Sequence, residues 1–268
     1  MTQSGFLAIS KGTLHYWRYG EGPELFIALH GFGGDGRVFN ALGNALQAHQ
    51  SLVALELPWH GQTQWPAHSF GPEDFVEAIA KVLEITGQSR FSAIGFSFGG
   101  RLWLSTLETW APVLDRLYLV SPDGIATRWK GWTEPLPVRM RQQMARFIEN
   151  PKPALNLADW LYRKQLLHRY GHRFLHRHLP DPGRRQRLVQ TWVAAARFPV
   201  RFARLRSYLK QSGLPVCVVI GESDPLIDRH AFARLAKEIP QICLRVLKGD
   251  HELLRRPEWF DLLSAKKE

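Results

Sequence analysis

The chain has 268 residues and a mass of 30.7 kDa, which suits one large domain or a core domain with an insertion. Hydrophobic residues make up 45% and charged residues 22%, which excludes an intrinsically disordered polymer, a collagen-like fibre and a small disulfide scaffold. The net charge is +11, and it is uneven: residues 122–212 hold 19 Lys and Arg against 5 Asp and Glu, whereas the rest holds 16 against 19.

The first part of the chain alternates between predicted strands and helices. Runs at 6–10 and 13–19 are rich in aromatic and β-branched residues and are separated by Lys11-Gly12, which predicts a hairpin. The continuous apolar run 25–29 is typical of a parallel strand buried on both faces. Strands follow at 52–57, 91–96 and 117–120, with helices at 38–48, 72–86 and 99–110. This order predicts an α/β fold with a doubly wound, mostly parallel sheet.

The alternation stops at Ser121-Pro122 and resumes about ninety residues later. Residues 122–212 are helical in character and dense in Arg, so we expect a helical, strongly basic lid inserted there. The core would then comprise residues 1–121 and 213–268. Its second part has predicted strands at 214–220 and 242–247 and helices at 229–238 and 257–265.

A candidate nucleophile lies in Gly95-Phe96-Ser97-Phe98-Gly99, which follows a predicted strand and opens a predicted helix. This is the context that a G-x-S-x-G elbow requires, since small residues on both sides of the serine allow a sharp turn. The helix that starts behind Ser97 also places its positive dipole end where an oxyanion would form.

A serine hydroxyl needs a base, and the base needs a carboxylate to fix its tautomer. Asp224 and His251 follow the predicted strands 214–220 and 242–247, at the end of the sheet where α/β proteins place their sites. We therefore predict the catalytic set Ser97, Asp224 and His251. Asp123 also lies just past a strand and is the alternative acid, unless it is a turn residue before Gly124.

These motifs resemble the α/β-hydrolase superfamily over nearly the full chain, in particular its lid-bearing serine hydrolases. His30-Gly31-Phe32-Gly33-Gly34 is similar to the family's H-G-x-x-G loop, and residues 56–61, Glu-Leu-Pro-Trp-His-Gly, resemble its D-x-P-G-H-G stretch with Glu for Asp and Trp for Gly. The resemblance implies an oxyanion hole made by the N–H groups of Phe32 and Phe98, with His30 bracing the loop. Serine at the elbow, where relatives that cleave haloalkanes and epoxides have aspartate, favours acyl transfer to water.

The leading functional hypothesis is a carboxylesterase that cleaves an ester or thioester through an acyl-enzyme, without metal or cofactor. The alternative is a C–C bond hydrolase or lyase of the same fold acting on an anionic carbonyl substrate. Some such lyases have arginine where this chain has Arg101, which would then bind substrate; the competing interpretation is a surface ion pair. A binding protein on this scaffold is the non-enzymatic alternative.

The basic segment has a repeat of four. Lys164, His168, His172 and His176 would share one helix face, and Arg169, Arg173 and Arg177 an adjoining one. This predicts either an anion site, for a carboxylate substrate, an acidic carrier or an anionic lipid surface, or a solvated basic face. A metal site is disfavoured because no carboxylate completes the histidine set in the sequence pattern, and nucleic acid binding is not expected because no recognised module accompanies the charge.

The cellular compartment is predicted from the lack of a membrane-spanning stretch or a secretory signal, and from the small number of cysteines. No apolar stretch is long enough to cross a bilayer, and residues 1–10 lack the features of a secretory signal, so we expect a cytoplasmic protein. Cys217 and Cys243 lie in β-branched runs, which predicts two reduced, buried core residues.

Overall fold

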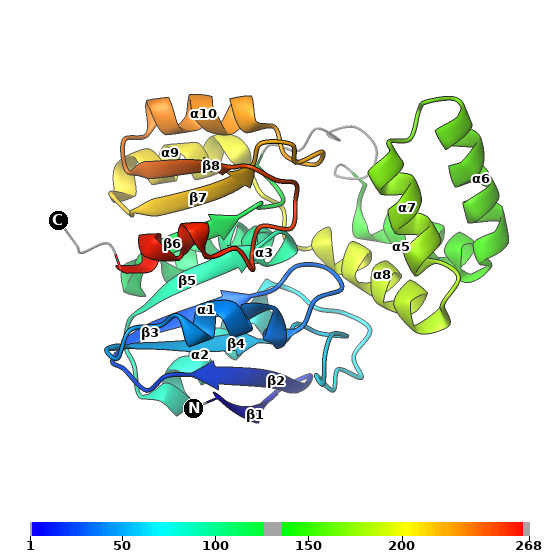
Figure 1. The fold of residues 1–268 in the computed structure, drawn as a ribbon. Coiled ribbons are helices and arrows are strands. Elements are labelled where there is room, and N and C mark those ends of the chain that lie inside the picture. The colour runs from blue at the N-terminus through cyan, green and yellow to red at the C-terminus, as the bar shows by residue number, and fades with distance from the viewer. Residues whose placement is uncertain (1, 126–135, 265–268) are drawn as a thin grey trace.

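A computed structural model describes residues 2–125 and 136–264 (Figure 1). An eight-stranded sheet has the order β1-β2-β4-β3-β5-β6-β7-β8. The strands are β1 (Thr2–Ile9), β2 (Gly12–Tyr19), β3 (Glu24–Leu29), β4 (Gln50–Leu55), β5 (Phe91–Phe96), β6 (Leu114–Val120), β7 (Val216–Gly221) and β8 (Ile242–Leu247). β1 and β2 form the predicted antiparallel hairpin, β2 pairs antiparallel with β4, and all later neighbours are parallel. The doubly wound α/β fold is thus confirmed.

Helices connect the strands on both faces of the sheet. Their bounds are η1 (Gly36–Phe39), α1 (Asn40–Asn44), α2 (Pro72–Thr86), α3 (Phe98–Ser105), α4 (Leu107–Trp110), η2 (Ala111–Val113), α5 (Val138–Glu149), α6 (Pro151–Arg163), α7 (Arg169–His178), α8 (Pro182–Ala195), α9 (Phe202–Ser212), α10 (Arg229–Glu238) and η3 (Pro257–Ser264), where η marks a 3₁₀ helix. The predicted bounds of α2 and α10 are confirmed. α2 begins where Asp74 accepts the N–H of Gly71, and it ends at Gly87, whose φ of +67° is the left-handed conformation of a C-terminal cap.

Three predicted helices differ from the structure. Residues 38–48 form only η1 and α1, because Gly43 and Asn44 are poor helix formers at the end of the turn. The helix predicted at 99–110 divides at Thr106, whose hydroxyl donates to the Leu102 carbonyl 2.9 Å away. The closing helix is the 3₁₀ helix η3, and Ala265, its predicted last residue, lies outside the described residues.

The core consists of two apolar clusters, one on each face of the sheet. In β3, Leu25, Ile27 and Leu29 belong to one cluster, whereas Phe26 and Ala28 belong to the other. Alternate residues of a strand point to opposite faces, so a strand covered on both sides needs an uninterrupted apolar run. α2, α3, α9 and α10 cover the first face, and α1 and η3 cover the second (Figure 1).

Helices α5 to α9 lie in the chain between β6 and β7, where an insertion was predicted. In Figure 1, α5 to α8, the inserted helices, form a separate layer to one side of the sheet. α9 differs, because its buried Leu205 and Leu209 belong to the same apolar cluster as Leu117 and Val216 of the sheet. α9 is therefore part of the core layer, although the charge pattern assigns it to the inserted block.

The two cysteines have different environments. Cys217 in β7 is buried, and Cys243, its register partner in β8, is exposed; neither forms a disulfide. The prediction of a buried Cys243 was wrong because β8 is the last strand of the sheet and has a neighbouring strand on one side only. Within residues 2–125 and 136–264, no helix combines the length and apolar character that a bilayer crossing requires.

Candidate active site

Ser97 occupies a sharp turn between β5, which ends at Phe96, and α3, which begins at Phe98. Its φ of +49° is in a region that residues with a Cβ rarely adopt, so the turn is strained. Two backbone hydrogen bonds to the neighbouring strand end hold it: Ser97 N–H donates to the Val120 carbonyl (3.0 Å), and the Asp123 N–H donates to the Ser97 carbonyl (3.1 Å). The serine is therefore fixed at the carboxyl end of the sheet.

The glycines that flank Ser97 are required by close packing of backbone. A Cβ on Gly95 would lie 2.7 Å from the Cα of Gly100, and one on Gly99 would overlap the carbonyl oxygen of Leu29. Helix α3 can therefore pack closely against the ends of β5 and β3 only with hydrogen at both positions. This explains the G-x-S-x-G spacing in physical terms.

His251 and Asp224 complete a chain of hydrogen bonds to the serine. His251 Nε2 lies 3.1 Å from Ser97 Oγ, and His251 Nδ1 lies 2.8 Å from Asp224 Oδ2. Both side chains are buried, at the ends of β8 and β7. Because an ionised carboxylate can only accept, Nδ1 carries the ring proton and Nε2 is left to accept the Ser97 hydroxyl.

The Asp224 carboxyl is held ionised by its surroundings. Burial alone would raise its pKa, but the hydrogen bond from His251 and the Leu226 N–H, which donates to Asp224 Oδ1 at 2.8 Å, bring the pKa below the ordinary value. A carboxylate fixed by two donors can orient an imidazole without taking its proton.

Asp123, the alternative acid, has a different partner. Its two oxygens accept from Arg101 Nε (2.7 Å) and Nη2 (3.1 Å), a two-point ion pair. Arg101 also donates to the Phe198 carbonyl, 3.4 Å away, and its side chain is 9% exposed. Arg101 and Asp123 both line the cavity that Ser97 lines. The carboxylate that is hydrogen-bonded to His251, however, belongs to Asp224.

The loop after β3 passes next to the serine. A Cβ on Gly31 would lie 3.0 Å from the Cβ of Ser97, and the next residue, Phe32, lines the same cavity as Ser97. His30 braces this loop, since its Nδ1 donates to the Gly31 carbonyl (2.7 Å) and its Nε2 accepts the Leu57 N–H (3.0 Å). The N–H of Phe98, the first residue of α3, belongs to the helix turn whose donors have no partner within the helix.

His60 holds the other side of the same loop. Its Nε2 accepts the Gly33 N–H at 3.0 Å, and its Nδ1 donates to the Pro58 carbonyl at 2.8 Å. Burial, together with the neighbouring His30, keeps the pKa of His60 well below its ordinary value, and burial also lowers the pKa of His30. Both imidazoles are therefore neutral braces rather than titrating participants at neutral pH.

These buried histidines make the fold sensitive to acid. Between the unfolded pKa of a histidine, about 6.5, and the lower folded value, only the unfolded chain binds the proton. The stability present above pH 6.5 is therefore lost as pH falls, by about 1.4 kcal/mol per pH unit for each such group.

We expect urea unfolding between pH 7.5 and 5 to give a smaller slope of the free energy of unfolding against pH for His60→Gln than for the wild type. An unchanged slope would contradict a neutral His60, and exposed His230→Gln is the control.

A cavity of about 510 Å³ opens in front of the serine. Its wall comes from both parts of the fold: Phe32, Ser97 and His251 from the core, and side chains of α5, α7 and α8 from the inserted helices. Arg141 of α5 stacks over Trp192 of α8, with the guanidinium carbon 5.3 Å from the ring centroid, and donates to the Trp192 carbonyl at 2.7 Å. The sequence does not predict this pair, because the two residues are on different helices and share no spacing signal.

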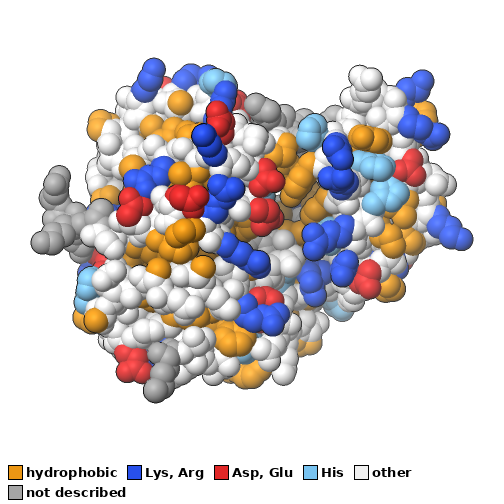
Figure 2. Space-filling model, viewed as in Figure 1, with side chains coloured by type: hydrophobic (Ala, Val, Ile, Leu, Met, Phe, Trp, Pro, Cys, Tyr) orange, Lys and Arg blue, Asp and Glu red, His pale blue; other side chains and the backbone are white. Residues whose placement is uncertain are grey.

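The repeat of four in the basic segment is only partly one helix face. Lys164 caps α6 and His168 caps α7, so only His172 and His176 of that set lie on α7. Arg169, Arg173 and Arg177 are exposed, and Figure 2 shows Lys, Arg and His side chains frequent over the inserted helices. The histidines, in contrast, contact Asp159 of α6, each with its Nε2 2.7 Å from Asp159 Oδ1. The expectation that no carboxylate completes the histidine set was therefore wrong, because the turn after α6 brings the two helices together.

Comparison with known proteins agrees with this architecture. A family profile described as "alpha/beta hydrolase fold" matches residues 24–254. The magnesium-chelatase 30 kDa subunit of Rhodobacter capsulatus is 24% identical over 260 residues, covering 90% of this chain and 86% of that protein. A pimeloyl-[acyl-carrier protein] methyl ester esterase of Aeromonas salmonicida (strain A449) is 25% identical over 256 residues, covering 91% and 94%.

Solved structures share the fold at low identity. The thioesterase domain from the curacin biosynthetic pathway has a TM-score of 0.70 with 16% identity, covering 99% of this chain and 100% of that one. An esterase from Thermogutta terrifontis has a TM-score of 0.71 with 16% identity, covering 98% and 97%. The chain therefore belongs to the α/β hydrolase fold family, and its esterase relatives support an enzyme of the carboxylesterase type.

Proposed function

We propose that this protein is a serine hydrolase that cleaves a carboxylic ester or thioester through an acyl-enzyme. The observation that carries the proposal is the hydrogen-bonded chain Asp224–His251–Ser97 in the wall of a mostly apolar cavity. Such a chain supplies a nucleophile, a base and a group that orients the base.

In the proposed reaction, Ser97 Oγ attacks the substrate carbonyl carbon while its proton passes to His251 Nε2. The resulting oxyanion accepts the N–H groups of Phe32 and Phe98, each worth about 3 kcal/mol in the transition state. The tetrahedral intermediate then expels the alcohol or thiol, which takes the proton from His251. A water molecule, deprotonated by His251, repeats the attack on the acyl-enzyme and releases the carboxylic acid. The ionised Asp224 stabilises the imidazolium in both halves.

We further propose that the inserted helices act as a lid. α7 and α8 contribute Phe174, Leu188 and other apolar side chains to the wall of the cavity that Ser97 also lines. An acyl chain of medium length therefore has apolar surface to contact. The relative named as a methyl ester esterase, similar over 91% of this chain, supports an ester rather than another acyl derivative.

The second candidate is C–C bond hydrolysis of an anionic carbonyl compound. It is favoured by Arg101 and Arg141, which both line the cavity. Arg101 was a candidate substrate-binding residue. Its guanidinium is already paired with the carboxylate of Asp123 through two hydrogen bonds, which supports a role in shaping the cavity wall instead. We therefore place ester cleavage first.

A comparison of substrates tests this order. We expect p-nitrophenyl esters to be hydrolysed, with kcat/KM rising from acetate to hexanoate by up to about fourfold per methylene, because each buried methylene is worth about 0.8 kcal/mol. A vinylogous diketone acid should turn over far more slowly. Cleavage of the diketone without ester turnover would reverse the assignment, and an ester series with no dependence on chain length would contradict an acyl site in the cavity.

A further inference from the structure

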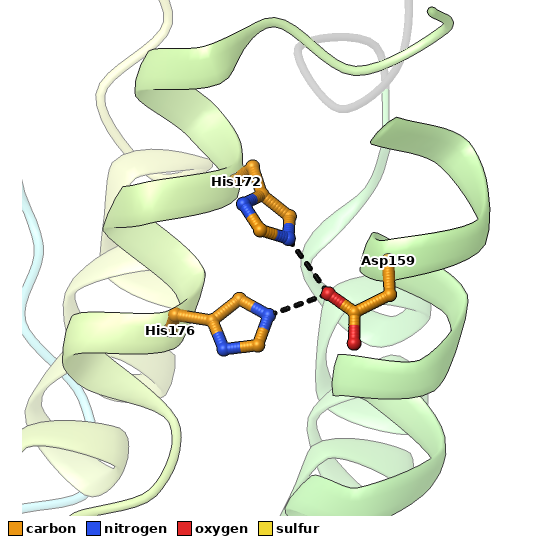
Figure 3. Close-up of side chains that lie close together, drawn as sticks. All are labelled: Asp159, His172 and His176. Carbon is orange, nitrogen blue, oxygen red and sulfur yellow. Dashed lines mark hydrogen bonds and ion pairs between the residues drawn. The ribbon is translucent and has the colours of Figure 1, made fainter. Parts of the chain in front are cut away.

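A second cluster of side chains with potential metal ligands lies away from Ser97, between α6 and α7 (Figure 3). Asp159 projects from α6, and His172 and His176 project from successive turns of α7 toward it. One donor atom from each of the three residues lies within 4.8 Å of the other two. Among the residues that the structure describes, this is the one such group of His, Cys, Asp or Glu.

The cluster is already organised in the way that a cation site requires. Both Nε2 atoms lie 2.7 Å from the same carboxylate oxygen, Asp159 Oδ1, so the rings face the space that a shared cation would take. The ring of Tyr162 stacks on His172, with centroids 4.3 Å apart and planes 18° apart, and limits its rotation. Two histidines four residues apart on a helix form one side of the site, and the second helix provides the other.

We propose that Asp159, His172 and His176 bind a zinc ion. Two imidazoles and one carboxylate are a donor set that suits zinc, whereas magnesium and calcium prefer oxygen ligands alone. Zinc–ligand distances of about 2.0–2.2 Å in a tetrahedron place neighbouring donors about 3.3 Å apart, so each N···O separation must widen by only about 0.6 Å. On binding, the single N–H proton of each neutral ring moves from Nε2 to Nδ1, so the Nε2 lone pair is free to bind the ion. Because the cluster is partly exposed, water completes the coordination.

The consequence of binding is a cross-link between two of the inserted helices. Tyr170 and Phe174, which line the cavity, lie on the face of α7 opposite His172 and His176, since residues two apart on a helix differ by about 200°. An ion that ties α7 to α6 therefore fixes one wall of the cavity without touching substrate. The site is also distinct from Ser97, His251 and Asp224, so zinc binding does not depend on the proposed chemistry.

The charges around the cluster predict an unusual salt dependence. Exposed Arg169 and Arg173 lie beside the histidines on α7, and exposed Arg163 ends α6. These three cations outweigh the single negative charge of Asp159, so an incoming zinc ion meets net repulsion, which salt screens. The affinity for zinc should therefore rise with ionic strength, whereas a site surrounded by acidic groups would lose affinity.

Calorimetric titration of the metal-stripped full chain with Zn²⁺ tests the proposal. We expect one ion per chain in the wild type, and at least a tenfold weaker dissociation constant in each of Asp159→Asn, His172→Ala and His176→Ala. Co²⁺ bound in place of zinc should give visible absorption bands of tetrahedral intensity that these variants lose. Circular dichroism verifies that each variant is folded. If a variant does not fold, the Co²⁺ bands of the wild type still test whether the site binds metal.

Control variants exclude other zinc ligands on the chain. His230→Ala and Cys243→Ser remove an exposed histidine and an exposed thiol, and Ser97→Ala and His251→Gln alter the proposed active site; all four should bind zinc as the wild type does. Retention of wild-type affinity in Asp159→Asn, or loss of binding in His251→Gln or Cys243→Ser alone, would overturn the proposal. Absence of any zinc or cobalt binding by the wild type would also overturn it, without bearing on hydrolysis.

Discussion

Replacement of Ser97 by alanine should abolish hydrolysis, with kcat for p-nitrophenyl esters falling by at least about 10⁴-fold. The reason is that His251 Nε2, 3.1 Å from Oγ, would no longer have a hydroxyl to activate. Labelling of the protein by a fluorophosphonate probe should disappear together with activity. Mass spectrometry of the labelled wild type should find the adduct on Ser97.

The matched control for this variant is Ser105→Ala, a second serine on the same strand–helix unit whose hydroxyl donates to the Pro199 carbonyl. It should retain both labelling and turnover. A folded wild-type protein that resists the probe would favour the binding-protein interpretation. Equal labelling of wild type and Ser97→Ala would place the nucleophile elsewhere.

The second large effect on turnover is expected when Asp224, the proposed acidic residue of the catalytic set, is replaced. Asp224→Asn should lower kcat by about 10⁴-fold, because an amide that donates to Nδ1 selects the wrong imidazole tautomer. The carboxylate also stabilises the imidazolium, and hydrogen bonds from His251 and the Leu226 N–H lower the pKa of Asp224, which keeps it ionised. Steady-state turnover of a hexanoyl ester, measured for folded protein at 15–20 °C, roughly the range of maximal stability, gives the ratio.

Asp123→Asn provides the comparison at an equivalent strand end. Its carboxylate binds Arg101, so this change should leave kcat within about tenfold and act mainly on stability, where loss of one partner of a buried ion pair costs about 3–5 kcal/mol at most. Because Asp123 is one-third exposed, the measured loss should be smaller. A larger loss of kcat in Asp123→Asn than in Asp224→Asn would make Asp123 the acid.

Local sequence patterns were sufficient for much of the fold. The hairpin, α2, α10 and the parallel strands follow from periodicity, turn residues and capping, which act between residues close in the chain. The elbow at Ser97 was recognisable for the same reason, since the strand, the glycines and the helix are contiguous. Predictions failed where the environment of a residue depends on the order of the strands. Cys243 was predicted to be buried, but it is exposed because it lies in the edge strand β8.

What the sequence by itself determined was the alternation of strands and helices, the sharp turn at Ser97 and the presence of Asp and His after later strands. Only the tertiary structure decided which carboxylate meets His251, that Arg101 binds Asp123, that Arg141 stacks on Trp192, and that Asp159 meets two histidines. Short-range sterics and periodicity depend only on residues that are close together in the sequence. Pairing between distant residues depends on strand order and on how the inserted helices pack, and neither leaves a spacing signal in one chain.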